Sequence, residues 1–313
     1  MSKILITGSS GFIASNLIRY MLKNFSEYKI SSIDNINDIK AINSIYYNGR
    51  HSFYIGDISN AHLMDRVFEI EKPDVIIHGA SVFNNNSEMI NANILGTQTL
   101  IDAAIKHKVD RFVYISDYKV YGPINNEDSP YTEESLLFPN TIYAATKASS
   151  ELLLKAANIQ NGLKYNILRL SNNYGPWQQK NNLITNIVTN IIENKEVNIY
   201  NKGEEINDWS FVQNTCSAIK TVVEKGQLNE IYNVSSEAEF SNIEVFNEIC
   251  NIMGKGYELL KFVPEPTYRG FRYSANASKL KNLGWKPEYK FKGMDSAISY
   301  SIQWIKNNYS FYR

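Results

Sequence analysis

The chain has 313 residues, of which 43% are hydrophobic and 20% are charged, and this composition is typical of a globular enzyme large enough to bury a sizeable core. Lys plus Arg balances Asp plus Glu at 32 each, so the net charge favours binding neither to nucleic acid nor to a membrane surface. Met1 leads into an apolar strand without a signal peptide, and no apolar run could span a bilayer, so we expect a cytoplasmic protein.

Short apolar strands alternate with amphipathic helices along the first half of the chain. We predict strands at residues 3–7, 30–34, 52–56, 74–78, 111–116 and 165–170, and helices at residues 12–23, 61–70, 91–107 and 143–158. Short links between alternating strands and helices predict an α/β fold with a doubly wound parallel sheet of the Rossmann type.

After residue 174 the alternation becomes irregular. We predict a helix at residues 183–194, an alternating stretch at 209–224, a strand at 230–235, and a tail broken by Gly and Pro. The sequence therefore predicts two interwoven domains. The Rossmann domain would comprise residues 1–174 with about 205–238, and a smaller domain would comprise about 175–204 with 239–313.

The turn after the first strand reads Thr7-Gly8-Ser9-Ser10-Gly11-Phe12-Ile13-Ala14. Small residues between a strand and a helix let backbone N–H groups approach a pyrophosphate. An ordinary tight connection is the alternative, but Asp34, at the end of the next strand, favours a dinucleotide because its carboxylate can bind ribose hydroxyls. That carboxylate would repel a 2′-phosphate, so we expect NAD rather than NADP. Asp57 and Ile58 could hold the adenine, although Asp57 could equally cap the next helix.

Tyr143 and Lys147 lie one turn apart on a predicted helix and so share a face. A nearby ammonium can lower the pKa of a phenol, so that the phenolate accepts an alcohol proton while hydride leaves the same carbon. A second pair with this spacing, Tyr257 and Lys261, falls in an expected tail strand. Tyr143 instead follows the strand that ends near Ser116, where parallel sheets bind ligands, so we assign catalysis to Tyr143 and Lys147.

Together these motifs resemble the extended short-chain dehydrogenase/reductase superfamily and, within it, the nucleotide-sugar 4,6-dehydratases. The matching stretches span nearly the whole chain: residues 7–14, 34, 91–96, 115–122, 143–147, 171–176, 208–209 and 283–287. The resemblance implies NAD that is reduced and reoxidised within one turnover, and a homodimer joined through the helices near Asn93 and Tyr143. The expected cofactor contacts are Gly8, Gly11, Phe12, Ile13, Asp34, Asn35, Asp57, Ile58, Ala80, Tyr143 and Lys147.

The family's usual strand-end pattern is Ser-Thr-Asp-Glu-Val-Tyr-Gly, in which Thr contacts O4, Asp is the acid and Glu is the base. Asp117, Tyr118 and Lys119 occupy those three positions here and are expected to be catalytic. Lys in place of Glu resembles the dehydratases that act on UDP-N-acetylglucosamine and invert C5, and this implies a 4-keto-6-deoxy product. The alternatives are dTDP-glucose 4,6-dehydratase, a nucleotide-sugar 4-epimerase and a non-enzymatic NAD sensor. Three proton-bearing side chains favour dehydration over epimerisation.

The resemblance also implies a set of substrate contacts, which are Ser81, Asn172, Asn173, Asn182 and Arg272. A planar guanidinium binds phosphate oxygens bidentately, so Arg272 is the expected diphosphate ligand, with Arg269 as a possible helper. Asn207 stands where the family usually has another Arg. Either arginine could instead be a solvated surface residue. No metal site is expected, because the four histidines and two cysteines lack ligand spacing.

Overall fold

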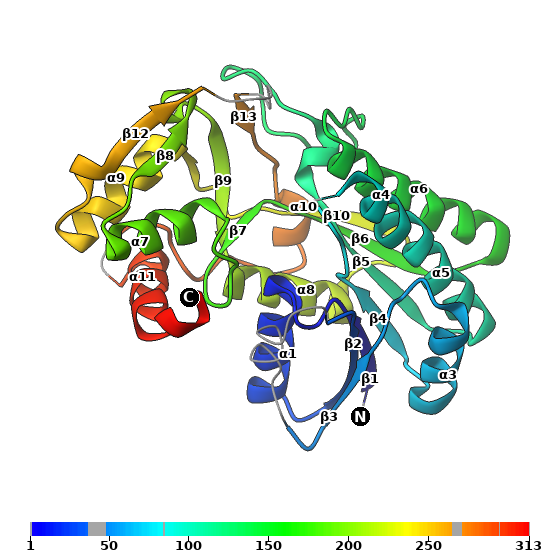
Figure 1. The fold of residues 1–313 in the computed structure, drawn as a ribbon. Coiled ribbons are helices and arrows are strands. Elements are labelled where there is room, and N and C mark those ends of the chain that lie inside the picture. Colours follow the sequence, from blue (N-terminus) through cyan, green and yellow to red (C-terminus); the bar gives the residue numbers. More distant parts are fainter. Residues whose placement is uncertain (1, 37–47, 84, 265–270, 294, 313) are drawn as a thin grey trace.

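The computed structural model describes residues 2–36, 48–83, 85–264, 271–293 and 295–312. Within these ranges, the largest sheet has seven parallel strands in the order β10-β6-β5-β4-β1-β2-β3 (Figure 1). The bounds are β1 Ser2–Thr7, β2 Tyr28–Asp34, β3 His51–Ile55, β4 Val75–His78, β5 Arg111–Asp117, β6 Tyr165–Leu170 and β10 Glu230–Val234. The predicted Rossmann sheet is confirmed.

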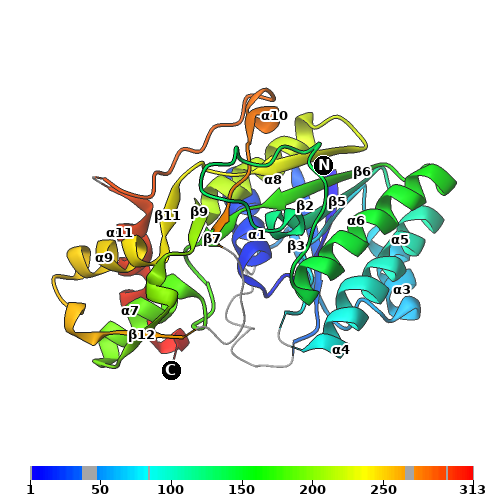
Figure 2. The same cartoon turned by 90° about the horizontal axis from the view of Figure 1, so that it is seen from above.

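Helices cover both faces of this sheet (Figures 1 and 2). One face carries α3 Ala61–Glu71, α5 Gly96–Lys106 and α6 Ile142–Asn161, and the other carries α1 Phe12–Asn24 and α8 Val212–Lys225. In β1, Leu5 packs into the core beneath the first group, whereas Ile4 and Ile6 pack toward the second. Successive strand side chains point to opposite faces, and burial on both faces explains the unbroken apolar run. Of the helices described, none combines the length and apolarity needed to cross a bilayer.

The predicted helix at residues 91–107 begins earlier and is irregular. It comprises α4 Asn86–Met89, a π-helical segment η1 Ile90–Leu95, and α5. A π-helical turn inserts an extra residue and reorients the side chains of that turn, and such segments often mark functional sites. Here the reoriented residues include Asn93.

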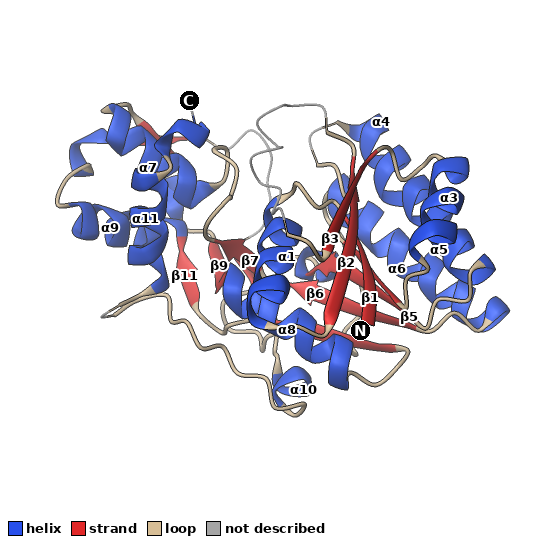
Figure 3. Cartoon of the chain, turned by 90° about the horizontal axis from the view of Figure 1, so that it is seen from below, coloured by secondary structure: helices blue, strands red, loops and turns tan. Residues whose placement is uncertain are grey.

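The rest of the described chain builds two smaller sheets beside the large one (Figure 3). The first contains β7 Asn172–Tyr174, β9 Ile206–Phe211, β11 Glu239–Ser241 and β13 Arg272–Tyr273, and the second pairs β8 Val197–Tyr200 with β12 Leu260–Val263. The accompanying helices are α7 Leu183–Glu193, α9 Asn242–Met253, α10 Ser278–Lys281 and α11 Ala297–Asn307, with short turns η2 Tyr118–Tyr121, η3 Asn201–Gly203, η4 Tyr257–Leu259 and η5 Tyr309–Tyr312.

The path of the chain between these sheets bears on the predicted division into two domains. β9 joins the smaller sheet through β7, β11 and β13, whereas α8 and β10, which follow it, return to the large sheet. The predicted domain boundary near residue 205 assigned β9 to the Rossmann domain. In the structure, β9 pairs with the strands of the smaller sheet. The division as a whole stays a prediction.

A buried ion pair fastens α6 to the large sheet. Arg169 of β6 and Glu151 of α6 are 1% and 0% exposed, and Nη2 lies 2.6 Å from Oε2. Glu151 also accepts a hydrogen bond from Ser116 at the end of β5, and Arg169 donates to the Tyr121 hydroxyl. Desolvating two charges is costly, and these additional hydrogen bonds offset that cost. The pair therefore fixes the carboxyl-terminal ends of β5 and β6 against α6.

Replacing Arg169 with Met should lower the free energy of unfolding by about 3–5 kcal/mol, because it leaves the Glu151 charge buried and unpaired. Urea-induced unfolding measures this change. The matched control is Arg66→Met, which removes the exposed Arg66–Glu69 pair and should change stability by less than about 0.5 kcal/mol. Similar losses in both variants would show that the buried pair has no special role.

Candidate active site

A cavity of about 520 Å³ opens at the carboxyl ends of the parallel strands, the usual ligand position in a doubly wound sheet. Its walls come from the segments that follow each strand from β1 to β6. All the predicted cofactor contacts lie in these walls: Gly8, Gly11, Phe12, Ile13, Asp34, Asn35, Asp57, Ile58, Ala80, Tyr143 and Lys147. The sheet therefore brings together residues that are spread over most of the first half of the chain.

The turn between β1 and α1 is shaped to admit a dinucleotide. Gly8 has φ of +74°, and a Cβ added there would lie 2.7 Å from the Cα of Ala80, so only glycine fits. Gly11 precedes the first residue of α1, and no side chain caps that helix. The N–H groups of its first turn are thus available to an anion, and the helix dipole favours negative charge there. These features fit the pyrophosphate of NAD.

Two carboxylates, Asp34 and Asp57, line the end of this cavity next to β2 and β3. Asp34 accepts hydrogen bonds from the backbone and hydroxyl of Ser10, which hold it beside the glycine turn, where a ribose would lie. Asp57 accepts from the backbone and hydroxyl of Ser59, both at 2.8 Å. The cap of α3 is Asn60, so the alternative that Asp57 caps this helix is wrong. Asp57 instead shapes the turn that presents Ile58.

Tyr143 and Lys147 lie at the opposite end. Burial together with the nearby Asp117 raises the pKa of the Tyr143 phenol, and the Ser81 side chain opposes this change. Lys147 donates to the carbonyl of Ile115, and its ammonium nitrogen lies 4.4 Å from the centre of the Tyr114 ring. Burial lowers the pKa of Lys147 to about 8, although Asp117 and Glu151 oppose the change. The ammonium is thus fixed in the wall of the same cavity that Tyr143 lines.

Asn93, in the π-helical segment, supports this arrangement. The side-chain amide of Asn93 accepts a hydrogen bond from the Val82 backbone N–H, and it donates to the Val82 carbonyl and to the Thr146 hydroxyl of α6. The backbone carbonyl of Asn93 accepts a hydrogen bond from the Ser150 hydroxyl. One residue thus connects the loop after β4 to the helix that carries Tyr143. Residues 91–96 resemble a family motif, but the sequence carries no signal for this role of Asn93.

The three consecutive residues predicted to handle protons point to different places. Asp117 lines the first cavity and accepts from the backbone N–H of Lys119 at 2.8 Å; burial raises the pKa of this carboxyl, opposed by Lys119. The side chain of Lys119 lines a second cavity, with its nitrogen 5.3 Å from the centre of the Tyr273 ring. Tyr118 is buried, and its hydroxyl donates to Asn207 at 3.0 Å. Of the three, Tyr118 lies outside both cavity walls as described.

The second cavity, of about 840 Å³, lies among α7, β8 and β9. It shares Asn172 and Asn182 with the first cavity, so the two cavities adjoin at those residues. Nine asparagines occur among its described walls: Asn172, Asn181, Asn182, Asn186, Asn190, Asn198, Asn201, Asn207 and Asn242. Its charged side chains in the described residues are Lys119, Lys202, Glu204 and Glu205. Amides both donate and accept, which suits a hydroxyl-rich ligand.

The predicted substrate contacts are only partly placed in these cavities. Ser81, Asn172, Asn173 and Asn182 all line the first one. The side-chain amide of Asn173, however, donates a hydrogen bond to the carbonyl of Ser171 and accepts one from the Thr215 hydroxyl. Both of its polar groups are thus engaged within the protein. Asn172 and Asn182 remain the residues that face both cavities. Lys202, Glu204 and Glu205 could not be predicted from the sequence, because a turn before a strand gives no signal of cavity lining.

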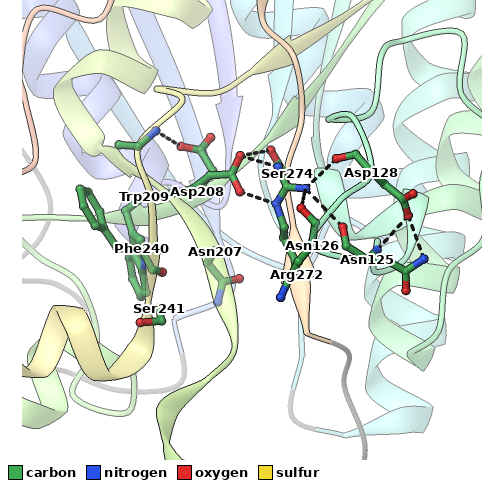
Figure 4. Close-up of polar contacts among 12 residues, drawn as sticks. Asn125, Asn126, Asp128, Asn207, Asp208, Trp209, Phe240, Ser241, Arg272 and Ser274 are labelled. Carbon is green, nitrogen blue, oxygen red and sulfur yellow. Dashed lines mark hydrogen bonds and ion pairs between the residues drawn. The ribbon is translucent and has the colours of Figure 1, made fainter.

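Arg272 lies in an ion pair instead of in the described cavity walls (Figure 4). Its Nε and Nη2 donate to the two carboxylate oxygens of Glu239, and Nη1 donates to the carbonyls of Asn125, Asn126 and Asp128. All three nitrogens are thus engaged, and Arg272 ties β13 to β11 and to residues 125–128. Contact with a diphosphate would require exchange of these bonds. Arg269, the expected helper, lies outside the described residues.

Comparison with known proteins agrees with this geometry. Residues 4–235 match the NAD dependent epimerase/dehydratase family. The low-salt glycan biosynthesis protein Agl12 of Haloferax volcanii is 32% identical over 96% of the chain and 98% of that protein. The dTDP-glucose 4,6-dehydratase of Haemophilus influenzae is also 32% identical, over 99% of both chains.

A similar protein has been solved with a cofactor. The dTDP-glucose 4,6-dehydratase of Bacillus anthracis, in complex with NAD, superposes with a TM-score of 0.92 at 32% identity, covering 100% of this chain and 99% of that one. The cavity described above therefore belongs to a fold that holds NAD in a similar protein.

Replacing Gly8 with Ala should weaken NAD binding by roughly tenfold or more, because the methyl group overlaps the Ala80 backbone and strains the turn. The control is Gly162→Ala, which also has a positive φ but has open space around the added carbon. It should leave the dissociation constant unchanged and cost about 1 kcal/mol in stability. Fluorescence titration with NADH measures the dissociation constant of each variant. Equal affinity in the two variants would contradict the proposed role of the turn.

Proposed function

The chain belongs to the NAD dependent epimerase/dehydratase family, and we propose that it is an NAD-dependent nucleotide-sugar 4,6-dehydratase, a hydro-lyase. One observation carries the proposal: the NAD-type cavity with Tyr143 and Lys147 adjoins, at Asn172 and Asn182, a polar cavity that contains Lys119. A redox site and a separate proton-handling group thus lie in neighbouring cavities. The resemblance to dTDP-glucose 4,6-dehydratases over nearly the full length supports it.

The first step is oxidation of the sugar at C4. NAD, when bound by the glycine turn and Asp34, supplies a hydride acceptor for this carbon and can return the hydride later. Tyr143 accepts the proton of the 4-hydroxyl. Because burial and Asp117 raise the pKa of this phenol, the ammonium of Lys147 is needed beside it to favour the phenolate. Ser81 and Asp117 help to orient the hydroxyl that loses its proton.

The second step is loss of water across C5 and C6. A carbonyl at C4 makes the C5 proton acidic, and a base must remove it as the 6-hydroxyl leaves. Lys119 takes the place of the family's glutamate and is directed into the second cavity, so we assign it to C5. An epimerase has no need of such a group, because it only removes and returns hydride at C4.

Two substrates are supported by different observations. Similarity to proteins named dTDP-glucose 4,6-dehydratase favours dTDP-glucose. Lys119 at the glutamate position favours UDP-N-acetylglucosamine, with inversion at C5, as in the dehydratases it resembles. Arg272 as diphosphate ligand remains a prediction for either substrate.

The decisive experiment incubates the protein and NAD with dTDP-glucose and with UDP-N-acetylglucosamine, followed by mass spectrometry and NMR. At least one substrate should lose one water, and NMR reports the configuration at C5. An unchanged mass with an altered C4 configuration would indicate an epimerase, and no change with either substrate would refute the proposal.

The matched control uses the two tyrosines with the same spacing to a lysine. Tyr143→Phe should lower kcat by about 10²–10⁴-fold, the range for loss of a general acid or base. Tyr257→Phe should have no effect, because Tyr257 is exposed and its hydroxyl donates to Asn251.

The described surface also supports a homodimer. Exposed apolar side chains occur on η1 and α6, which contact each other: Ile90, Leu95, Ile142, Leu152 and Ile159. Leu152 and Ile159 are seven residues apart, so they lie on one side of α6. Large exposed apolar groups in neighbouring helices are typical of an interface, and a twofold axis would pair this surface with itself.

Leu152→Asp should shift the protein toward monomer, because a carboxylate would be buried without a partner in the dimer. Sedimentation velocity measures the association state over a range of concentrations. Ile70→Asp, on the separate helix α3 and 60% exposed, is the control and should not change it. A wild-type protein that sediments as a monomer would refute this interface.

A further inference from the structure

The water-loss step lacks an obvious acid in this chain. Departure of the 6-hydroxyl requires a proton donor near that oxygen. Tyr118, at the position of the family's acid, is 2% exposed and donates its hydroxyl proton to the Asn207 side chain. Asp117 lines the first cavity near Tyr143. The proposed mechanism places C4 of the sugar there, away from the 6-hydroxyl. A different group must therefore protonate the leaving oxygen.

The bond from Tyr118 leads to a carboxylate. Asn207 accepts from Tyr118 through its Oδ1, and its Nδ2 donates to Oε1 of Glu205 at 2.9 Å. Both ends of the amide are thus used, which fixes its orientation. Figure 4 shows Asn207 projecting from β9 on the side opposite to Asp208, as alternation along a strand requires. The chain Tyr118–Asn207–Glu205 therefore ends at the wall of the second cavity.

Lys119 belongs to the same neighbourhood. Its nitrogen lies over the ring of Tyr273, whose centre is 6.0 Å from that of Tyr118. Tyr273 pairs with Asn207 in the parallel register of β13 and β9. The two tyrosine rings are in contact at a tilt of 49°. Lys119 lies over the Tyr273 ring, and Asn207 accepts the hydrogen bond of the Tyr118 hydroxyl. Lys119 and Glu205 thus face the same cavity from adjoining elements.

We propose that Glu205 is the catalytic acid that protonates the leaving 6-hydroxyl, and that Tyr118 and Asn207 are positioning residues that hold it opposite Lys119. This rests on the proposed dehydratase function. The Lys119 amine takes the C5 proton, and the electrons of that C–H bond form the C5–C6 double bond. The C6–O bond breaks with its electron pair, and the carboxyl proton of Glu205 goes to that oxygen. Water leaves, and the pair ends as ammonium and carboxylate.

The neighbouring Glu204 lacks this support. It lines the same cavity but is exposed, whereas Glu205 is half-buried and held by Asn207. Because an acid must be positioned within hydrogen-bond reach of the oxygen it protonates, the held carboxylate is better suited than the exposed one. The adjacent pair of glutamates provides a matched control.

The test compares Glu205→Gln with Glu204→Gln in heavy water, using the substrate that wild-type protein dehydrates. Mass spectrometry follows both water loss and deuterium exchange at C5, and absorbance follows NADH. Glu205→Gln should lower the rate of water loss by roughly 10²–10⁴-fold while C4 oxidation and C5 exchange persist, since Tyr143 and Lys119 are intact. Glu204→Gln should slow water loss far less than Glu205→Gln, because the exposed Glu204 carboxylate is not held by Asn207. Tyr118→Phe should lower kcat about tenfold with KM unchanged, as loss of positioning predicts.

Equal effects of the two glutamine variants, or loss of C5 exchange together with water loss in Glu205→Gln, would overturn the assignment. Glu205→Asp keeps the acid and should recover part of the rate, which separates chemistry from misfolding. Absence of water loss in wild-type protein with every nucleotide sugar would instead refute the dehydratase function, and with it this role for Glu205.

Discussion

The buried ion pair between Glu151 and Arg169 holds the catalytic side of the molecule in place. It joins α6, which carries Tyr143 and Lys147, to β6, and through Ser116 it fixes the end of β5. The bond from Arg169 to Tyr121 extends this network to the turn after Asp117. Because separating a buried ion pair leaves an uncompensated charge, the pair stabilises the relative placement of these elements. The geometry of the site follows from that constraint.

Two cavities meet above this network, and each is built by a different part of the fold. The first lies at the ends of parallel strands, where every crossing returns the chain to the same edge. The second is formed by the smaller sheets and α7. Asn172 and Asn182 line both, so a bound cofactor and a bound substrate would meet there. In the proposed mechanism, this arrangement places the hydride transfer near Tyr143 next to the proton transfer assigned to Lys119.

Departures from the family pattern that lie far apart in sequence form one structural feature. Tyr118 replaces an acid and Asn207 replaces an arginine, and the two are hydrogen-bonded to each other. A tyrosine hydroxyl buried without a partner would be costly, so the amide at residue 207 compensates for the change at residue 118. The same amide holds Glu205 at the cavity wall. Arg272, by contrast, is committed to Glu239 and stabilises the smaller sheet.

By itself, the sequence determined the Rossmann sheet, and it predicted the glycine turn, Asp34 and the Tyr143–Lys147 pair, all of which line one cavity, because periodicity, small residues in turns and helical spacing are local signals. It could not determine where Tyr118, Lys119 and Arg272 point, although all three stand in recognisable motifs. Their directions depend on partners such as Asn207, Tyr273 and Glu239, which come from distant segments and meet only in the folded chain. The π-helical turn at Asn93 and the Glu205 side chain were likewise decided by tertiary structure, since packing between sheets and helices, and not spacing along the chain, selects which polar groups face a cavity.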